Sequence, residues 1–461
     1  MNALVNIALI GFLPVAMALF ALLPPSKAFL WVALLGWLFL PVASIRIPVI
    51  ADYGKFTAVG FALIIGTVIF HPILLLNFRL KWYDIPALLW PLCQFPASIA
   101  NGYGLYDGTS QFVNHFMMWT MPYVLTRCYF TKAEYLREVA TAVVVAGMIY
   151  VPLCAFELRM SPKLHLTVYG YYAAPFFDMV RLGGYRPIVF MNHGLALALM
   201  MCGAAFIAGW FWYFGAVQKI GRFHIRWVAL ALAVIAVLTK SSGALMIFAF
   251  LLGLVVVSRV SRLKWVLLLP VLLMPAYMFG RTMELTDGRF MLDATRAIFR
   301  AEDGRDGSVI ARLIQEDQVV ALIREKPLTG WGNWGPGQDQ LWLLLGRNTG
   351  MISLACWVLA FSLPLILVVL SDWRQRRDLF LFGVPLGLVC IAFVMDGLFN
   401  GMFNPLWVIC SAAVMTAATE KEQNSALDTT RKLRHQKAGS LVAPGSAREK
   451  VRSAQGPATL R

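Results

Sequence analysis

The stretch SSGALMIFAFLLGLVVVSRVSRLK, residues 241–264, decides the fold class. Its central run, residues 243–258, contains no charged side chain and is almost entirely apolar. A helix of about 20 such residues spans the hydrocarbon core of a bilayer. The basic loop SRVSRLK that follows is typical of the cytoplasmic side of a membrane, where short loops retain Lys and Arg. The stretch therefore predicts a membrane-spanning helix that ends in the cytoplasm.

Runs of this kind recur through the chain. The 461 residues are 59% hydrophobic and 14% charged, with a mean hydropathy of +0.69, whereas a soluble protein carries about 25% charged residues. The runs are continuous rather than alternating, which excludes a β-barrel. We therefore predict an all-α polytopic integral membrane protein with about 12–13 transmembrane helices. The expected spans lie near residues 3–23, 28–45, 56–76, 84–101, 111–128, 138–156, 190–214, 226–242, 243–258, 263–281, 348–371, 378–398 and 402–418.

Short basic loops fix the orientation of these spans. The loops 218–226, 258–264 and 371–378 are rich in Lys and Arg and should be cytoplasmic. Two longer segments, residues 157–189 and 281–340, then face the periplasm. The net charge of +16 resides mainly in short loops and the tail, so we expect no nucleic-acid partner. The predicted domains are membrane helices at 1–280, a periplasmic catalytic loop at 281–347, membrane helices at 348–418 and a disordered basic cytoplasmic tail at 419–461.

The second periplasmic segment contains a predicted amphipathic helix. The sequence GSVIARLIQEDQVVALIREKP, residues 307–327, has apolar residues near helical spacing and ends at Pro327. On this helix Arg312 and Glu316 are four residues apart, and Asp317 is adjacent. One interpretation is a surface ion pair of little energetic value. The other is an Arg that binds phosphate through its planar two-donor fork and is held in place by Glu316.

Further cations should gather on the same face of the membrane. Arg186 precedes a span, Lys240 closes another, and Arg281 closes a third, all on the periplasmic side of this topology. With Arg312 they break the positive-inside bias, which indicates an anionic ligand there. Taken singly, Arg186 could be a side chain that extends to the interface, and His193 could be a core histidine that bonds a carbonyl.

Four motifs occur in a fixed order from Tyr185 to Leu354. They are RPIVFMNHGLALALMM, LTKSSGALMIFAFLLGLVVV, ARLIQEDQVVALIREKPLTGWGNWG and DQLWLLLGRNTGMISL. In this order they resemble the O-antigen ligase/polymerase superfamily, most closely its exopolysaccharide polymerase-like branch. The resemblance implies an inner-membrane glycosyltransferase. Such an enzyme takes a glycan from undecaprenyl pyrophosphate on the periplasmic face and joins it to a hydroxyl of an acceptor.

The resemblance also suggests roles for individual residues. Arg186 and Arg312 match the family's Arg positions, which bind the pyrophosphate. The family's His, which is thought to activate the acceptor, corresponds to Asp339, and residues 281–340 contain no His. This departure fits the polymerase-like branch and puts a lipid A ligase role in doubt. We therefore predict Asp339 as the general base, with Glu316 and Asp317 as alternatives.

The remaining expectations concern substrates and partners. The expected pyrophosphate-binding residues are Arg186, Arg312, Lys240, Arg281 and Arg347, and the expected glycan-binding residues are Trp331, Trp334, His193 and Asp317. We expect no metal and no cofactor, because the outer loops lack a D-x-D motif and the cations already supply charge. The expected partners are a lipid-linked oligosaccharide, the membrane and other polysaccharide-assembly proteins. A ligase that acts on lipid A core or protein, and a flippase or transporter for a lipid-linked oligosaccharide, are the alternatives.

Overall fold

The chain is described by a computed structural model. It covers residues 3–47, 51–286, 293, 305–332 and 339–420, with the backbone alone at residues 47, 51 and 305–311. The residues up to Ala418 form one compact unit. From residue 421 on, the expected tail lies outside the described residues.

The described chain is helical almost throughout, which confirms an all-α polytopic membrane protein. Seven segments are long and apolar enough to cross a membrane: α1 (Ala3–Leu22), Ala133–Met160 with α8 (Leu136–Met160), α10 (Gly194–Phe214), α12 (Ser242–Ser261), Lys264–Thr282 with α13 (Leu269–Thr282), α16 (Leu341–Leu370) and Leu379–Asp396 with α17 (Val384–Asp396). Four shorter apolar helices are α2 (Pro25–Phe39), α3 (Lys55–Phe70), α11 (Ile225–Leu238) and α18 (Leu406–Thr419). The other helices are α4 (Ile85–Leu92), α5 (Gln94–Ala100), α6 (Gly104–His115), α7 (Met121–Tyr129), α9 (Leu164–Tyr169) and α15 (Arg305–Glu325).

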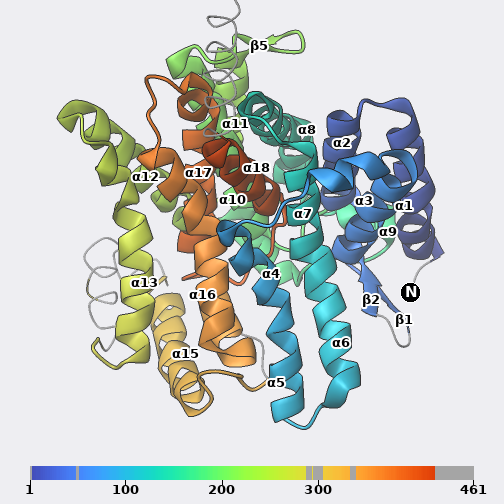
Figure 1. Ribbon diagram of the computed structural model, residues 1–461, viewed down its shortest axis with the longest axis vertical. Coiled ribbons are helices and arrows are strands. Elements are labelled where there is room, and N and C mark those ends of the chain that lie inside the picture. Colours follow the sequence, from blue (N-terminus) through green and yellow to red (C-terminus); the bar gives the residue numbers. More distant parts are fainter. Residues whose placement is uncertain (1–2, 48–50, 287–292, 294–304, 333–338, 421–461) are drawn as a thin grey trace, which may run out of the picture. The chain divides into compact units, whose positions relative to one another are not determined.

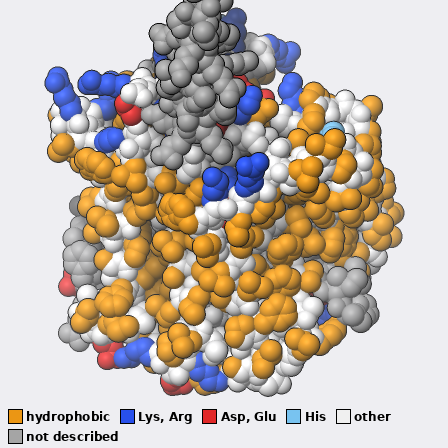
Figure 2. Space-filling model, viewed as in Figure 1, with side chains coloured by type: hydrophobic (Ala, Val, Ile, Leu, Met, Phe, Trp, Pro, Cys, Tyr) orange, Lys and Arg blue, Asp and Glu red, His pale blue; other side chains and the backbone are white. Residues whose placement is uncertain are grey.

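Three short antiparallel hairpins join helices at the ends of the bundle (Figure 1). They are β1–β2 (Ser44–Ile47 and Ala51–Gly54), β3–β4 (Val180–Arg181 and Gly184–Tyr185) and β5–β6 (Lys219–Ile220 and Phe223–His224). The β5–β6 hairpin lies in a basic loop at the upper end of Figure 1, whereas α15 and β1–β2 lie at the lower end. Figure 2 shows hydrophobic side chains across the middle of this face, with Lys and Arg side chains gathered above them. This distribution is typical of a protein that sits in a bilayer.

Two predicted spans depart from a regular α-helix. The first, 84–101, is divided into α4 and α5 at Cys93, next to Pro91. The second, 111–128, consists of α6, a π-helical segment at Phe116–Thr120 and α7. Proline removes a backbone donor and interrupts the helical ladder, which accounts for the first break.

Helix α16 is longer than the predicted span 348–371 and is kinked near its start. Gly350 has φ of 84° and ψ of 174°, a conformation that side-chain-bearing residues rarely adopt. A Cβ at Gly350 would lie 2.2 Å from the carbonyl oxygen of Leu328, and the amide of Met351 donates to the Pro327 carbonyl at 2.7 Å. The turn after α15 therefore packs into the kink. This contact fixes where α16 bends.

Candidate functional site

Arg186 is the most deeply buried cation of the site. It follows the β3–β4 hairpin, and its amide donates to the Met179 carbonyl at 2.7 Å. Its side chain is 1% exposed, yet Nε and Nη2 have no hydrogen-bond partner among the described residues. Gly194, the first residue of α10, packs against it so closely that a Cβ there would lie 2.8 Å from the Arg186 Nε. Unfilled donors on a buried guanidinium are costly, so they indicate a site built for an anion.

Arg312, on α15, lies near the same region, although it comes much later in the sequence. Its side chain is half-buried, and its Nε also has no hydrogen-bond partner in the described part of the chain. Burial lowers the pKa of Arg312, and the carboxylates of Asp339 and Asp396 partly offset this effect. Burial likewise lowers the pKa of Arg186 to about 10, with a further contribution from Arg181 and Arg312. The two guanidiniums thus belong to one electrostatic cluster, and both remain protonated at neutral pH.

The expected pairing of Arg312 with Glu316 is wrong. Glu316 is 1% exposed and bonds Arg281 of α13, with Nε to Oε1 at 2.5 Å. Tyr277 also donates to Oε1 at 2.7 Å, and the Gln340 amide donates to Oε2 at 3.1 Å. Arg281 binds Glu316 in place of Arg312 because its guanidinium contacts two carboxylates at once, Glu316 and Asp317, the latter at 2.5 Å.

The arrangement around Glu316 bears on three predicted site residues. Glu316 and Asp317 both bind Arg281, and the bond from Gln340 to Glu316 joins α13, α15 and the start of α16. Both oxygens of Glu316 are already occupied as acceptors. The geometry therefore favours a positioning role for this group, and direct contact of these residues with substrate stays a prediction.

Asp339 lies directly before α16, next to Gln340, the residue that precedes the first helical position. Its side chain is exposed. Its negative charge partly offsets the burial that lowers the pKa of Arg312 and of His193. The structure therefore places Asp339 near Arg312, and the role of Asp339 as the base stays a prediction.

His193 lies beside Arg186, at the start of α10. Its Nδ1 accepts a hydrogen bond from the Leu195 amide at 3.0 Å, which caps the helix. Burial lowers its pKa, and the neighbouring Arg186 lowers it further. The ring is therefore neutral at pH 7, and because Nδ1 accepts, the proton is assigned to Nε2. Nε2 lies 4.0 Å from the Asp178 carboxylate, which is beyond hydrogen-bond distance.

Three further residues of the cluster were not predicted from the sequence as site residues. Asp396, at the end of α17, is 2% exposed and accepts a hydrogen bond from Asn400 at 2.7 Å. It interacts electrostatically with both Arg186 and Arg312. Asp178, just before β3, and Arg181, the last residue of β3, contribute opposite charges beside Arg186. A charged residue inside a predicted span was the available signal for Asp396, whereas Asp178 and Arg181 lie in the segment between spans and carried no such signal.

Lys240 and Arg347 occupy supporting positions. The Lys240 Nζ donates to the Arg181 carbonyl at 3.1 Å and so anchors the β3–β4 hairpin. Arg347 is 6% exposed within α16, and its Nη1 donates to the Asn348 side chain at 3.1 Å. Their contacts to pyrophosphate stay predictions.

The tryptophans differ in accessibility. The Trp331 indole donates to the Leu322 carbonyl at 2.9 Å, and the Lys326 ammonium lies 4.0 Å from the centre of its ring. Trp342, near the start of α16, is fully buried and is therefore not available for stacking on a sugar. Trp334 lies outside the described residues.

Within the described chain, no group of three or more His, Cys, Asp or Glu side chains is placed to hold a metal ion. The geometry instead supplies positive charge through guanidiniums.

Comparison with known proteins gives one match. Residues 227–349 match a family model described as O-antigen ligase. No curated protein and no solved structure matches the chain significantly. The matched segment runs from α11 into the first half of α16, so it includes Arg312 and Asp339 but neither Arg186 nor Asp396.

Proposed function

The chain carries an O-antigen ligase domain at residues 227–349 and belongs to the O-antigen ligase/polymerase superfamily of membrane enzymes, and we propose that it polymerises glycan units carried on a polyprenyl pyrophosphate. The reaction takes place on the side of the inner membrane that faces the periplasm, opposite the basic loops. The donor is an undecaprenyl-pyrophosphate-linked glycan, and the acceptor is a sugar hydroxyl of a second chain.

One observation carries this proposal. Buried Arg186 and half-buried Arg312 come from distant parts of the sequence and hold unfilled donors in one cluster with Asp339. Guanidiniums bind phosphate through paired hydrogen bonds, and burial strengthens the interaction. A carboxylate beside them can accept a proton. Together they provide what transfer from a sugar pyrophosphate to a hydroxyl requires.

In the proposed reaction the acceptor oxygen forms a bond to the anomeric carbon of the donor sugar. The bond between that carbon and the phosphate oxygen breaks, and lipid pyrophosphate leaves with the electron pair. Arg186 and Arg312 stabilise the charge that develops on the leaving oxygens, and one such donor commonly contributes about 3 kcal/mol. The hydroxyl proton passes to the Asp339 carboxylate.

Asp339 is the best placed of the possible bases. Glu316 has both carboxylate oxygens engaged by Arg281, Tyr277 and Gln340. His193 uses Nδ1 as an acceptor for the Leu195 amide, so this nitrogen is not free to take a proton. Asp339 is exposed and lies near Arg312, where the donor phosphate would bind.

The decisive experiment follows the fate of a lipid-linked repeat unit. The protein is reconstituted in vesicles with this donor alone, and the products are separated by length. We expect a ladder of longer lipid-linked glycans and release of lipid pyrophosphate. Donor that crosses the bilayer with its glycan unchanged would instead identify a transporter. Donor that is consumed only after addition of lipid A core or an acceptor protein would identify a ligase.

A further inference from the structure

Lys55 is a buried cation outside the arginine cluster. It is the first residue of α3, directly after β2, and its side chain is 4% exposed. Its Nζ donates to the Phe190 carbonyl at 2.6 Å. An ammonium has three donors, so this bond uses one of them. Burial of a charged group is expensive unless it is compensated, so the position of Lys55 requires an explanation.

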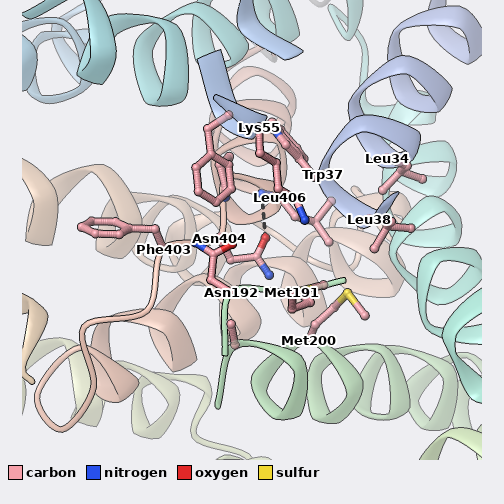
Figure 3. A pocket seen from close by; sticks show the side chains of 13 residues that line it. Leu34, Trp37, Leu38, Lys55, Met191, Asn192, Met200, Phe403, Asn404 and Leu406 are labelled. Atoms are coloured by element: carbon pink, nitrogen blue, oxygen red, sulfur yellow. Dashed lines mark hydrogen bonds between the residues drawn. The ribbon is translucent and has the colours of Figure 1, made fainter. Parts of the chain in front are cut away.

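Lys55 lies where two cavities adjoin. Both are lined by Lys55, Phe56, Asn192 and Phe403. The outer cavity has a volume of about 430 Å³ and reaches Asp52 and His115, and this volume falls within the range of small-molecule sites. The inner cavity narrows between apolar side chains (Figure 3).

Asn404 supplies a second unfilled donor in the inner cavity, which has a volume of about 20 Å³ and therefore has room for a small group but not for a sugar ring. Its side chain is 6% exposed, and Oδ1 accepts from the Leu406 amide at 3.1 Å, which caps α18. Its Nδ2 has no hydrogen-bond partner in the described part of the chain. Figure 3 shows Lys55, Asn192 and Asn404 around one space, with Trp37 and Phe403 on opposite sides of it in this view. Amides, an ammonium and aromatic walls together suit a sugar that carries a negative charge.

The pocket adjoins the arginine cluster through one short segment. The Phe190 carbonyl holds Lys55, Asn192 lines both cavities, and the next residue, His193, interacts electrostatically with Arg186. A molecule in this pocket would therefore lie beside the place where the donor pyrophosphate binds. Among described residues, no carboxylate forms an ion pair with Lys55, although Asp52 lines the outer cavity.

We propose that this pocket is an acceptor subsite that binds an acidic sugar residue, with the sugar's anionic group against Lys55. The assignment to the acceptor rests on the proposed function. The sugar ring lies in the outer cavity, where Asn192 binds one of its hydroxyls and Phe403 covers an apolar face. Its carboxylate enters the inner cavity, between Lys55 and the free Nδ2 of Asn404. Lys55 presents a point charge rather than a planar fork, which fits a single carboxylate better than a pyrophosphate. The pocket would thus select acceptor chains by charge.

Equilibrium binding tests the subsite without any donor. The probes are a uronate-containing tetrasaccharide and its carboxyl-reduced counterpart, added to the full-length protein in nanodiscs. We expect the wild-type protein to bind the acidic probe at least about tenfold more tightly, a difference typical of one charge-assisted hydrogen bond. Lys55→Met should remove this preference and leave the affinity for the reduced probe nearly unchanged.

Asn404→Asp provides a second, independent variant. The Asp retains the acceptor that caps α18, because Asp and Asn cap equally well. It replaces the free donor by a charge that repels a carboxylate, so the preference for the acidic probe should again be lost. Lys27→Met is the matched control, because Lys27 is also at the start of a membrane helix but lines a different cavity, between α2 and α8.

Two results would overturn the subsite: equal binding of both probes by the wild-type protein, or an unchanged preference in both folded variants. Failure of the subsite and failure of the proposed reaction are distinguishable. A protein that extends lipid-linked glycans but shows no preference contradicts only the subsite. A protein that shows the preference but does not transfer sugar contradicts the proposed reaction.

Discussion

At the scale of single residues, the site is defined by donors that the protein leaves unfilled. Most buried polar atoms in proteins find a partner, so exceptions indicate a ligand or a functional constraint. Arg281 and Arg312 illustrate the difference. Arg281 is fully engaged by Glu316 and Asp317, whereas the Nε of Arg312 has no described partner. Only the second arrangement leaves a guanidinium available for phosphate.

Arg312→Lys tests whether the planar fork is needed. The substitution keeps the positive charge but loses paired hydrogen bonding to phosphate. We expect transfer activity to fall about 10²-fold or more, as for loss of one transition-state donor, while the protein reaches the membrane in normal amounts. The measurement is the initial rate with lipid-linked donor. Full activity in Arg312→Lys, or polymer made normally by Arg312→Ala, would exclude Arg312 from the site.

Asp339→Asn separates a catalytic role from a structural one. If Asp339 is the base, the Asn variant cannot accept the proton, and the chemical step should slow by roughly 10²–10⁴-fold. Donor binding should be unchanged or tighter, because a negative charge near the pyrophosphate is gone.

Asp339→Ala is the companion variant. A residue that merely shapes the start of α16 would tolerate Asn and be harmed by Ala. Near-full activity in Asp339→Asn would therefore end the assignment of Asp339 as the base. Partial activity in Asp339→His would support it, because the resemblance places His at this position in ligases.

At the scale of elements, close packing at helix starts places the functional side chains. Gly194 at the start of α10 leaves room for the Arg186 side chain, and Gly350 lets the turn after α15 enter the kink of α16. The Arg281–Glu316–Gln340 contacts then tie α13, α15 and α16 together. These elements hold Arg186, Arg312 and Asp339 in one cluster, although the three come from separate stretches of sequence.

Gly194→Ala tests this packing. A Cβ would lie 2.8 Å from Nε and 2.9 Å from Cδ of Arg186, so the guanidinium must shift. A misplacement of about 1 Å at a reacting centre can lower a rate about 10²-fold. We expect weaker donor binding and slower transfer, with little loss of thermal stability, because the displaced group is a side chain.

Gly243→Ala is the matched control for this prediction. Gly243 is in the first turn of α12, and a Cβ there would meet nothing within 4 Å. It should retain wild-type donor affinity in the same titration. Equal effects of the two alanines would show that Gly194 does not act through Arg186.

At the scale of the whole molecule, the proposed reaction requires the site to face the periplasm. The loop that contains β5–β6 is basic, and α15 lies at the opposite end of the helices (Figure 1). The positive-inside rule then predicts that α15 faces the periplasm.

Cysteine labelling tests this orientation. All seven native cysteines are buried, so they should react little. Ala321→Cys places a thiol on an exposed position of α15, and Arg374→Cys places one in the basic loop between α16 and α17. A membrane-impermeant maleimide, added to cells whose outer membrane alone is permeable, should label the first and not the second. The reverse pattern would invert the topology.

The amino-acid sequence alone predicts the fold class, the approximate positions of the membrane helices and a site that contains Arg186, Arg312 and Asp339. Apolar run length and the placement of Lys and Arg suffice for the first two, because a bilayer requires long apolar helices whatever their neighbours are. The third came from the order of motifs within a resemblance.

Which acidic and basic side chains pair could be determined only from tertiary contacts. Spacing on a helix suggested that Glu316 holds Arg312, but Arg281 of another helix reaches Glu316 instead. The tertiary structure also brings Asp396 and the Lys55 pocket to the end of the bundle that holds the site. Local spacing cannot reveal such contacts, because a buried charge takes the partner that packing brings nearest, and that partner can lie anywhere in the sequence.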